Sequence, residues 1–215
     1  STLPVTSQPS VGDFAEAYRD AVADGAEEII SIHISSGISG TVNSARLATE
    51  QVSEVPIEVV DTLCASAAVQ LAVETAVHAR TLGGDLAAVR AATESEVAQQ
   101  RTVFTVDTLE YLYKGGRIGG AAALFGSLLQ LKPLLWFNEG RIDALERVRH
   151  TNRAMHRMVE VMEGWLPEGE PVKALLMEAA CKDRAEALVG MIRESRVNMV
   201  ECEIAPLSPV IGAHV

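Results

Sequence analysis

The stretch that decides the fold is EEIISIHISSGISGTVNSARLATEQV, residues 27–52. Its first part, residues 29–32, is rich in β-branched side chains and predicts a buried strand. From Thr41 onward apolar residues recur at helical spacing, namely Val42, Ala45, Ala48 and Val52. A strand, a short loop and a helix in this order are typical of an α/β fold, in which ligands bind at the carboxyl ends of the strands.

The loop between this strand and helix is the first candidate site. Ser35, Ser36 and Gly37 are small or hydroxylated and would let a ligand approach closely. Backbone N–H groups at a helix start have no partner within the helix, and the helix dipole favours negative charge there. The sequence therefore predicts that an anion binds to the amides of this loop.

The first half of the chain repeats the alternation of strand and helix. Gly83 and Gly84 separate its last two helices. The expected segments are helix 10–25, strand 27–35, helix 41–52, strand 56–63, helix 65–79 and helix 85–100. Helices between successive strands favour a parallel sheet. We therefore expect an N-terminal α/β domain with a parallel sheet over residues 1–101.

The second half mixes a hairpin with helices, which predicts a C-terminal α+β domain over residues 102–215, with a mixed or antiparallel sheet. Its hairpin spans 132–149 and turns at Asn138-Glu139-Gly140, and a short helix after strand 101–106 is expected to be capped by Asp107. The remaining segments are helix 121–131, helix 151–165, strand 172–180, helix 182–196, strand 199–207 and the strand-like stretch 208–213 before His214.

Charge and composition exclude several classes of protein. The net charge of −11 argues against general nucleic-acid binding. Residues 114–157 nevertheless carry a net charge of +5, and this basic segment could steer an acidic partner. Its basic residues are Lys114, Arg117, Lys132, Arg141, Arg147, Arg149, Arg153 and Arg157.

Cysteine and histidine spacing argue against metal and disulfide chemistry. The three cysteines contain no C-x-x-C pair, which indicates a reducing, cytoplasmic location and no disulfide framework. The five histidines show no metal-ligand spacing, so we expect no metal site. The longest apolar run, residues 121–137, is interrupted by polar residues and Pro133, which argues against a membrane span.

A nucleophilic serine is a competing interpretation of the loop. The residues Gly37-Ile38-Ser39-Gly40-Thr41 resemble the G-x-S-x-G elbow of hydrolases but lack its final glycine. An acyl hydrolase or transferase that uses Ser35 or Ser36 therefore stays an alternative. A third alternative is an interaction protein that binds an acidic partner and takes no ligand.

Several motifs together resemble one family. TSQPSVGDFAEAY, HISSGISGTVNSA, VVDTLCASAAVQLAV, FTVDTLEYLYKGGRIGGAAALFGSLLQLKPLL, EGRIDALERVRHTNRAM and PVIGAHV are similar, in this order, to the DegV family of bacterial fatty-acid-binding proteins. The resemblance implies two α/β domains with the ligand at their interface. It also implies a carrier without catalysis or cofactor, which binds one long-chain fatty acid and presents it to a fatty acid kinase.

The resemblance also assigns residues to roles. The carboxylate-holding hydroxyls of the family match Thr6 and either Ser35 or Ser36, next to Gly37, and its late histidine matches His214. Its basic docking positions match Arg117 and Arg149. The family's first segment and last turn have no counterpart here, so the sequence is expected to be either a piece of a longer protein or a shortened variant whose N-terminal domain lacks part of its sheet. Tail contacts are expected among Leu124, Phe125, Leu128, Leu129 and Met177.

Overall fold

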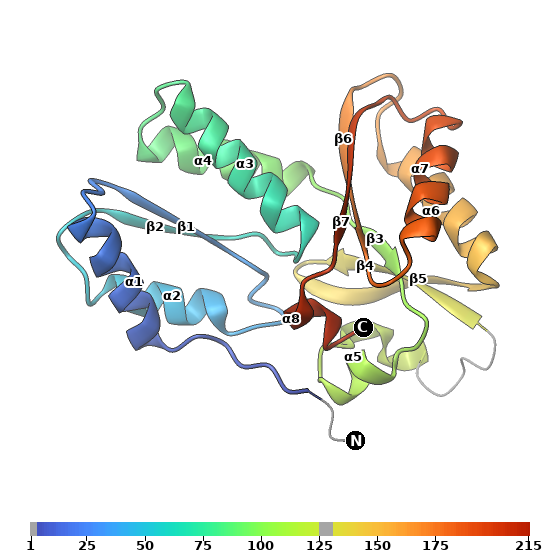
Figure 1. Cartoon of the computed structure of the whole chain (residues 1–215), viewed down its shortest axis with the longest axis horizontal. Helices are drawn as coiled ribbons and strands as arrows, with labels where there is room; N and C mark the ends of the chain where they lie inside the picture. Colours follow the sequence, from blue (N-terminus) through green and yellow to red (C-terminus); the bar gives the residue numbers. More distant parts are fainter. Residues whose placement is uncertain (1–3, 125–130) are drawn as a thin grey trace. The chain divides into compact units, whose positions relative to one another are not determined.

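The computed structural model describes residues 4–124 and 131–215 (Figure 1). Contacts divide the chain into two compact units, Thr6–Gln100 and Arg101–Val215, and the second also includes Pro4 and Val5. They are called the N-terminal and the C-terminal unit below. The predicted domains 1–101 and 102–215 remain predictions about independent folding.

The N-terminal unit is built on two parallel strands. β1 (Ile29–His33) pairs with β2 (Ile57–Asp61), from Ile29 beside Ile57 to His33 beside Asp61. Figure 1 shows two helices on each face of the strand pair. One face carries α1 (Val11–Ala23) and α2 (Thr41–Thr49), and the other carries α3 (Ala67–Thr81) and α4 (Leu86–Gln99). The predicted parallel α/β organisation is confirmed.

Local sequence explains where these helices begin and how they pack. Ser10 and Asp13 form a reciprocal capping box at the start of α1, and the Asp85 side chain accepts from the amide of Ala88 at the start of α4. The buried residues of α3 recur every fourth position as Ala68, Ala72 and Ala76. Small side chains at this spacing let α3 and α4 approach closely.

The C-terminal unit combines an antiparallel sheet with a parallel strand pair. The antiparallel sheet has the order β3 (Val103–Thr105), β4 (Leu131–Asn138), β5 (Arg141–Arg149), and β6 (Val172–Glu178) pairs in parallel with β7 (Met199–Pro206). The helices are α5 (Glu110–Lys114), the 3₁₀ helix η1 (Gly119–Leu124), α6 (Thr151–Trp165), α7 (Lys182–Arg193) and α8 (Pro209–Gly212). The predicted mixed architecture is confirmed.

The antiparallel sheet buries both of its faces. Leu134 and Leu135 are adjacent in β4 and both are fully buried, because successive side chains of a strand point to opposite faces. Leu135 packs with residues of α5 and η1, such as Leu112. Leu134 packs with Ala154 and Val161 of α6. Helices therefore cover the sheet on both sides.

The predicted Asp107 cap is wrong. α5 follows Leu109 and has no side-chain cap, while the amide of Glu110 donates to the Thr108 hydroxyl over 3.1 Å. The carboxylate of Asp107 instead accepts from Lys132 Nζ over 2.7 Å. Lys132 lies on β4, and the pairing of β4 with β3 brings its ammonium group to Asp107. A charged partner from a neighbouring strand has replaced the local cap.

The predicted helix 121–131 is corrected at both of its ends. Residues up to Leu124 form η1, a 3₁₀ helix, and Leu131 begins β4, while residues 125–130 lie outside the described part. Gly119 has a φ of +51°, and a Cβ there would lie 2.2 Å from the carbonyl oxygen of Ile142. This close approach to β5 requires glycine and accounts for the tight turn.

The strand-like stretch 208–213 is also corrected, because it contains the helix α8. The Ser208 hydroxyl accepts from the amide of Ile211, and Pro209 occupies the first turn. Serine before proline is a helix-start signal, and it outweighs a short apolar run that cannot distinguish strand from helix.

Candidate functional site

Two loops at the carboxyl ends of β1 and β2 are bonded to each other. They are residues 34–40, called the serine loop, and residues 62–66. The amide of Ser35 donates to the carbonyl of Cys64 over 2.7 Å. The amide and the hydroxyl of Thr62 both donate to the carbonyl of His33, over 3.1 and 2.9 Å. These bonds hold the serine loop against its neighbour in the same unit.

The two candidate serines lie in different surroundings. Ser35 is fully buried, and its hydroxyl oxygen accepts from the amide of Gly37 over 3.0 Å. Ser36 is exposed, and its amide donates to the carboxylate of Asp61 over 3.2 Å. Ser35 is thus a fixed part of the loop, whereas the Ser36 hydroxyl faces solvent.

The predicted anion site at the start of α2 stays a prediction, although several amides of the preceding loop already have acceptors. Six backbone amides in and directly after the loop donate to acceptors within the described part of this unit, and they are those of Ser35, Ser36, Gly37, Ile38, Ser39 and Thr41. One of the acceptors is itself a carboxylate, that of Asp61. The loop therefore offers hydroxyl groups to a ligand, and its amides from Ser35 to Ser39 already have acceptors.

Asp61 and Thr62 are the site residues that sequence reasoning missed. Asp61 accepts from the amide of Ser36 and, over 2.9 Å, from the amide of Leu63, so one carboxylate joins both loops. The sequence contained a signal for both residues, because Asp61 and Thr62 come directly after the apolar part of a predicted parallel strand. The carboxyl ends of parallel strands lie at one edge of the sheet, which is also where the serine loop lies.

Backbone strain is concentrated beside Asp61. Leu63 has a φ of +51°, and Ser66 has φ and ψ of +59° and −123°. Such conformations cost about 1–3 kcal/mol for residues other than glycine and are kept where surrounding bonds impose them. The hydrogen bonds of Asp61 and Thr62 restrain the loop of residues 62–66 in this way. Its strained conformation is therefore imposed by specific contacts.

The segment that carries Thr6 runs along the serine loop. Gln8 donates from Nε2 to the Ser44 hydroxyl over 3.2 Å, and its side chain covers Gly40 so closely that a Cβ there would lie 1.9 Å from Gln8 Oε1. Thr6, which is half-buried, precedes Gln8 by two residues. The structure therefore brings the region of Thr6 to the loop that contains Ser35.

His33, at the end of β1, takes part in a chain of hydrogen bonds. Its Nε2 lies 2.6 Å from the Ser31 hydroxyl, which lies 2.8 Å from the hydroxyl of Tyr18. Burial lowers the pKa of His33, and Asp61 opposes this effect. The imidazole is therefore neutral at neutral pH. Ser31 is a buried strand residue, and its hydroxyl is hydrogen-bonded to both Tyr18 and His33. These contacts suit a structural role for Ser31 better than a role as a nucleophile.

In the C-terminal unit, the structure brings His214 and Arg117 together. A Cβ on Gly115 would lie 2.3 Å from His214 Nδ1, so the imidazole packs on this glycine. Arg117 donates from Nη1 to the carbonyl of the same Gly115 over 2.5 Å. Burial lowers the pKa of His214, and the positive charge of Arg117 lowers it further. The imidazole is neutral at neutral pH and can both donate and accept.

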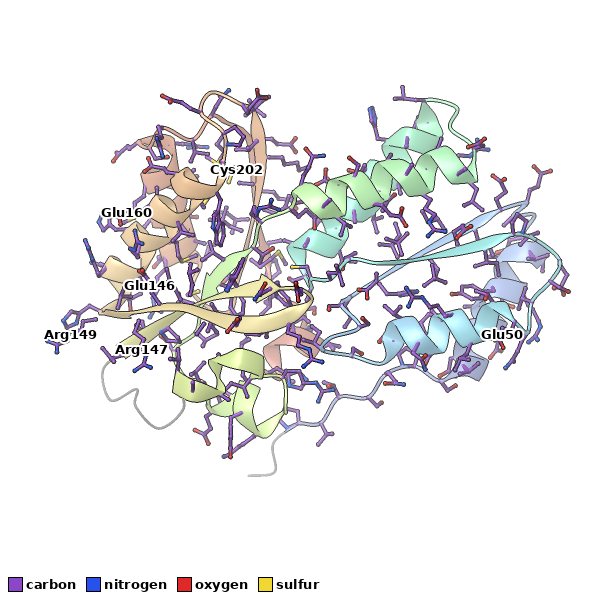
Figure 2. All side chains as sticks on the ribbon, turned by 180° about the vertical axis from the view of Figure 1, so that it is seen from behind. Glu50, Glu146, Arg147, Arg149, Glu160 and Cys202 are labelled. Carbon is purple, nitrogen blue, oxygen red and sulfur yellow. The ribbon has the colours of Figure 1, made fainter. Side chains whose placement is uncertain are left out.

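Arg117 and Arg149 do not form one cluster. Arg117 precedes Gly119, which contacts Ile142 near the start of β5, whereas Arg149 ends β5. Arg149 lies seven positions after Ile142 along the strand, which corresponds to about 23 Å. Figure 2 shows the exposed side chains of Arg147 and Arg149 extending from the end of β5.

Several cations of the basic segment are neutralised by acidic residues, most of them outside it. Lys114 pairs with Glu110, Lys132 with Asp107, and Arg157 with both Glu146 and Glu160. Within the described residues, Arg149 forms no ion pair. The positive charge available to a partner is therefore smaller than the sequence count suggests.

Of the residues expected to contact a ligand tail, two can be placed. Leu124 belongs to the core cluster that includes Leu112 and Ile118, and Met177 is half-buried in β6. Phe125, Leu128 and Leu129 lie outside the described residues.

The described part of the chain contains neither a candidate membrane span nor a metal-binding cluster. None of its helices is long and apolar enough to cross a membrane. Its histidine, cysteine and acidic side chains form no group of three or more that could hold a metal ion.

Comparison with known proteins assigns the family. The model of the DegV family, described as uncharacterised proteins, matches residues 1–215. A DegV domain-containing protein of Streptomyces coelicolor is 38% identical over 209 residues, which cover 97% of this chain and 74% of the relative.

Two solved structures match nearly the whole chain. A DegV family protein from Thermus thermophilus, described for its fatty acid binding, is 37% identical with a TM-score of 0.93, over 99% of this chain and 75% of that one. A DegV lipid-binding protein from Thermotoga maritima is 30% identical with a TM-score of 0.91, over 100% and 74%. The chain belongs to the DegV family.

Proposed function

We propose that this chain binds one long-chain fatty acid and holds its carboxyl group with uncharged hydrogen-bond donors. The observation that carries the proposal is the match to the Thermus thermophilus protein, which is described as binding fatty acid. A similar fold at this identity makes a common ligand class the simplest expectation. The site itself supports the proposal through the hydroxyl groups of the serine loop.

The proposal assigns the head group to Thr6 and to Ser35 or Ser36, beside Gly37, in the N-terminal unit. It assigns His214 in the C-terminal unit to the same group. Hydroxyl groups and a neutral imidazole can donate to a carboxylate without forming an ion pair. Absence of a bidentate guanidinium would leave a carboxylate oxygen available for attack on phosphorus.

The acyl tail would supply most of the affinity. Burial of a hydrocarbon chain contributes about 0.8 kcal/mol per CH₂, so a chain of about sixteen carbons gains roughly 12 kcal/mol before ordering costs. The head group then needs only to have its hydrogen bonds satisfied. Binding of this kind tolerates a weak head-group site.

The proposed role is that of a carrier without turnover, which presents the carboxylate to a fatty acid kinase. Arg149 suits partner docking, because it is exposed and forms no ion pair within the described residues. Arg117 is proposed to dock as well. It also lowers the pKa of His214, so its replacement would disturb the proposed head-group site and docking together.

Mass spectrometry of the intact protein tests the function. Purified protein should carry a mass increment of one fatty acid, which is released on denaturation and identified after extraction. Protein that contains no lipid and takes up none from added hexadecanoic acid would refute the proposal.

Serine variants test the head-group assignment. Either Ser35→Ala or Ser36→Ala should weaken hexadecanoic acid binding about tenfold, the effect of one lost hydrogen bond to a charged group. Ser53→Ala removes an exposed hydroxyl of the same unit and serves as the control. Equal affinity in all three variants would remove both serines from the site.

A further inference from the structure

Asp61 places a negative charge next to the serine loop. Its two carboxylate oxygens lie 3.2 and 3.3 Å from the amide nitrogen of Ser36, and one lies 2.9 Å from that of Leu63. Two backbone amides directed at one point would otherwise form an anion site. The protein fills this point with its own carboxylate.

The charge of Asp61 is not compensated by its neighbours. The described residues place no lysine or arginine in an ion pair with Asp61. His33 is its register partner across the strand pair, and burial lowers the pKa of this imidazole. His33 is thus neutral at neutral pH, so its imidazole does not offset the carboxylate charge next to the serine loop.

Repulsion from this charge depends on the charge of the ligand head group. At equal distance a dianion is repelled twice as strongly as a monoanion. A carboxylic acid carries at most one negative charge, whereas an alkyl phosphate carries nearly two above pH of about 7. The amides of Ser36 and Leu63, which donate to Asp61, are also not available as the backbone donors that phosphate sites in proteins commonly use.

We infer that Asp61 is a specificity-determining residue, which makes the serine loop select carboxylic acids against phosphorylated lipids of the same chain length. This inference rests on the proposed function, since it concerns the head group of the same ligand. Asp61 acts here through charge and through the two amides that it occupies.

The test compares two ligands on the same protein preparation. Hexadecanoic acid and monohexadecyl phosphate compete against a fluorescent fatty acid at a pH of about 8, where the phosphate is dianionic. The wild-type protein should prefer the acid, and Asp61→Asn should reduce this preference about tenfold, since the charge disappears while an oxygen acceptor remains. The affinity ratio does not depend on the folded fraction of the preparation.

Glu28→Gln is the matched control. Glu28 is exposed and immediately precedes β1, at the end of the strand opposite to the serine loop and about 20 Å away. Its substitution removes one negative charge from the same unit and should leave the preference unchanged. An equal reduction in this variant would reassign the effect to overall charge and overturn the inference.

A second measurement needs no substitution. Raising the salt concentration from about 0.05 M to about 0.5 M should reduce the preference of the wild-type protein for hexadecanoic acid over monohexadecyl phosphate. Salt screens the repulsion between Asp61 and a dianion more strongly than that between Asp61 and a monoanion. If Asp61→Asn keeps the wild-type ratio and salt leaves it unchanged, the inference fails while fatty acid binding stands. Wild-type protein that binds neither ligand would instead refute the proposed function.

Discussion

At the residue scale, one glycine controls the position of the C-terminal imidazole. Gly115 has a φ of −75°, so alanine can adopt its backbone without strain. The added methyl group would nevertheless lie 2.3 Å from His214 Nδ1 and 3.0 Å from the carbonyl oxygen of Tyr111. Any effect of Gly115→Ala is therefore steric, and the shortest contact of the added methyl group is with His214.

We predict that Gly115→Ala displaces His214, weakens fatty acid binding about tenfold and costs roughly 1–3 kcal/mol of stability. Titration with a fluorescent fatty acid and urea unfolding measure the two effects. Gly164→Ala, at a helix position with open space around the added methyl group, is the control and should keep the wild-type affinity. Unchanged binding in both variants would exclude His214 from the site.

The buried imidazole of His33 predicts a pH dependence of stability. Its pKa is lowered in the folded protein, so the unfolded chain takes up a proton first as the pH falls. Stability should therefore decrease as the pH is lowered through about 6.5, the value for an unfolded chain. His33→Gln should reduce this decrease, measured as urea midpoints at pH of about 7.5 and 5.5. His78→Gln, at an exposed position of α3, should keep it.

At the same scale, the sequence could offer Ser35 and Ser36 as candidate site residues, but it could not predict their hydrogen bonds. The exposed Ser36 and the buried Ser35 differ through partners that lie far along the chain, since Asp61 follows Ser36 by 25 residues. Rules that use only neighbouring residues in the sequence predict that loop amides have no hydrogen-bond acceptor. Only the register of β1 with β2 brings the Asp61 carboxylate to them.

At the scale of elements, long periodic segments were predicted correctly, whereas the short helices η1 and α8 were not. α6 and α7 each span a dozen residues or more, and their apolar spacing identifies them without tertiary information. α8 has four residues, too few for a period, and only Ser208 and Pro209 mark its start. The wrong cap of α5 has a tertiary cause, the ion pair of Asp107 with Lys132.

Two glycines, one inside a helix and one in a hairpin turn, should respond in opposite ways to substitution by alanine. Gly190 lies inside α7 with nothing near an added Cβ, so Gly190→Ala should stabilise the protein by about 0.5–1 kcal/mol. Gly140 turns the β4–β5 hairpin with a φ of +80°, so Gly140→Ala should destabilise it by about 1 kcal/mol. Thermal unfolding measures both, and shifts of the same sign would contradict the assignment of these conformations.

At the scale of the whole molecule, net charge gives only a partial account of the surface. The chain has a net charge of −11 with a basic segment at residues 114–157. Folding pairs some of those cations with acidic residues from outside the segment, such as Glu110 and Asp107. A count along the sequence cannot include partners that only the fold brings close.

Substitution of Arg149 should therefore distinguish most clearly between docking of the proposed kinase and binding of the fatty acid. It is exposed at the end of β5, in the same unit as the proposed ligand residue His214 but on a different element. We predict that Arg149→Glu weakens binding of the proposed kinase at least tenfold, and that this loss shrinks at high salt. Lipid occupancy, measured by mass spectrometry of the intact protein, should stay at the wild-type level.

Arg193→Glu is the matched charge reversal, at an exposed position that ends α7 and lies outside the basic segment. It changes the net charge by the same amount, so it should weaken kinase binding far less than Arg149→Glu if docking is local. An equal loss in both variants would mean that the partner responds to overall charge. A loss of lipid in Arg149→Glu would place this arginine in the ligand site, because rim charges alter association without changing what the interior holds.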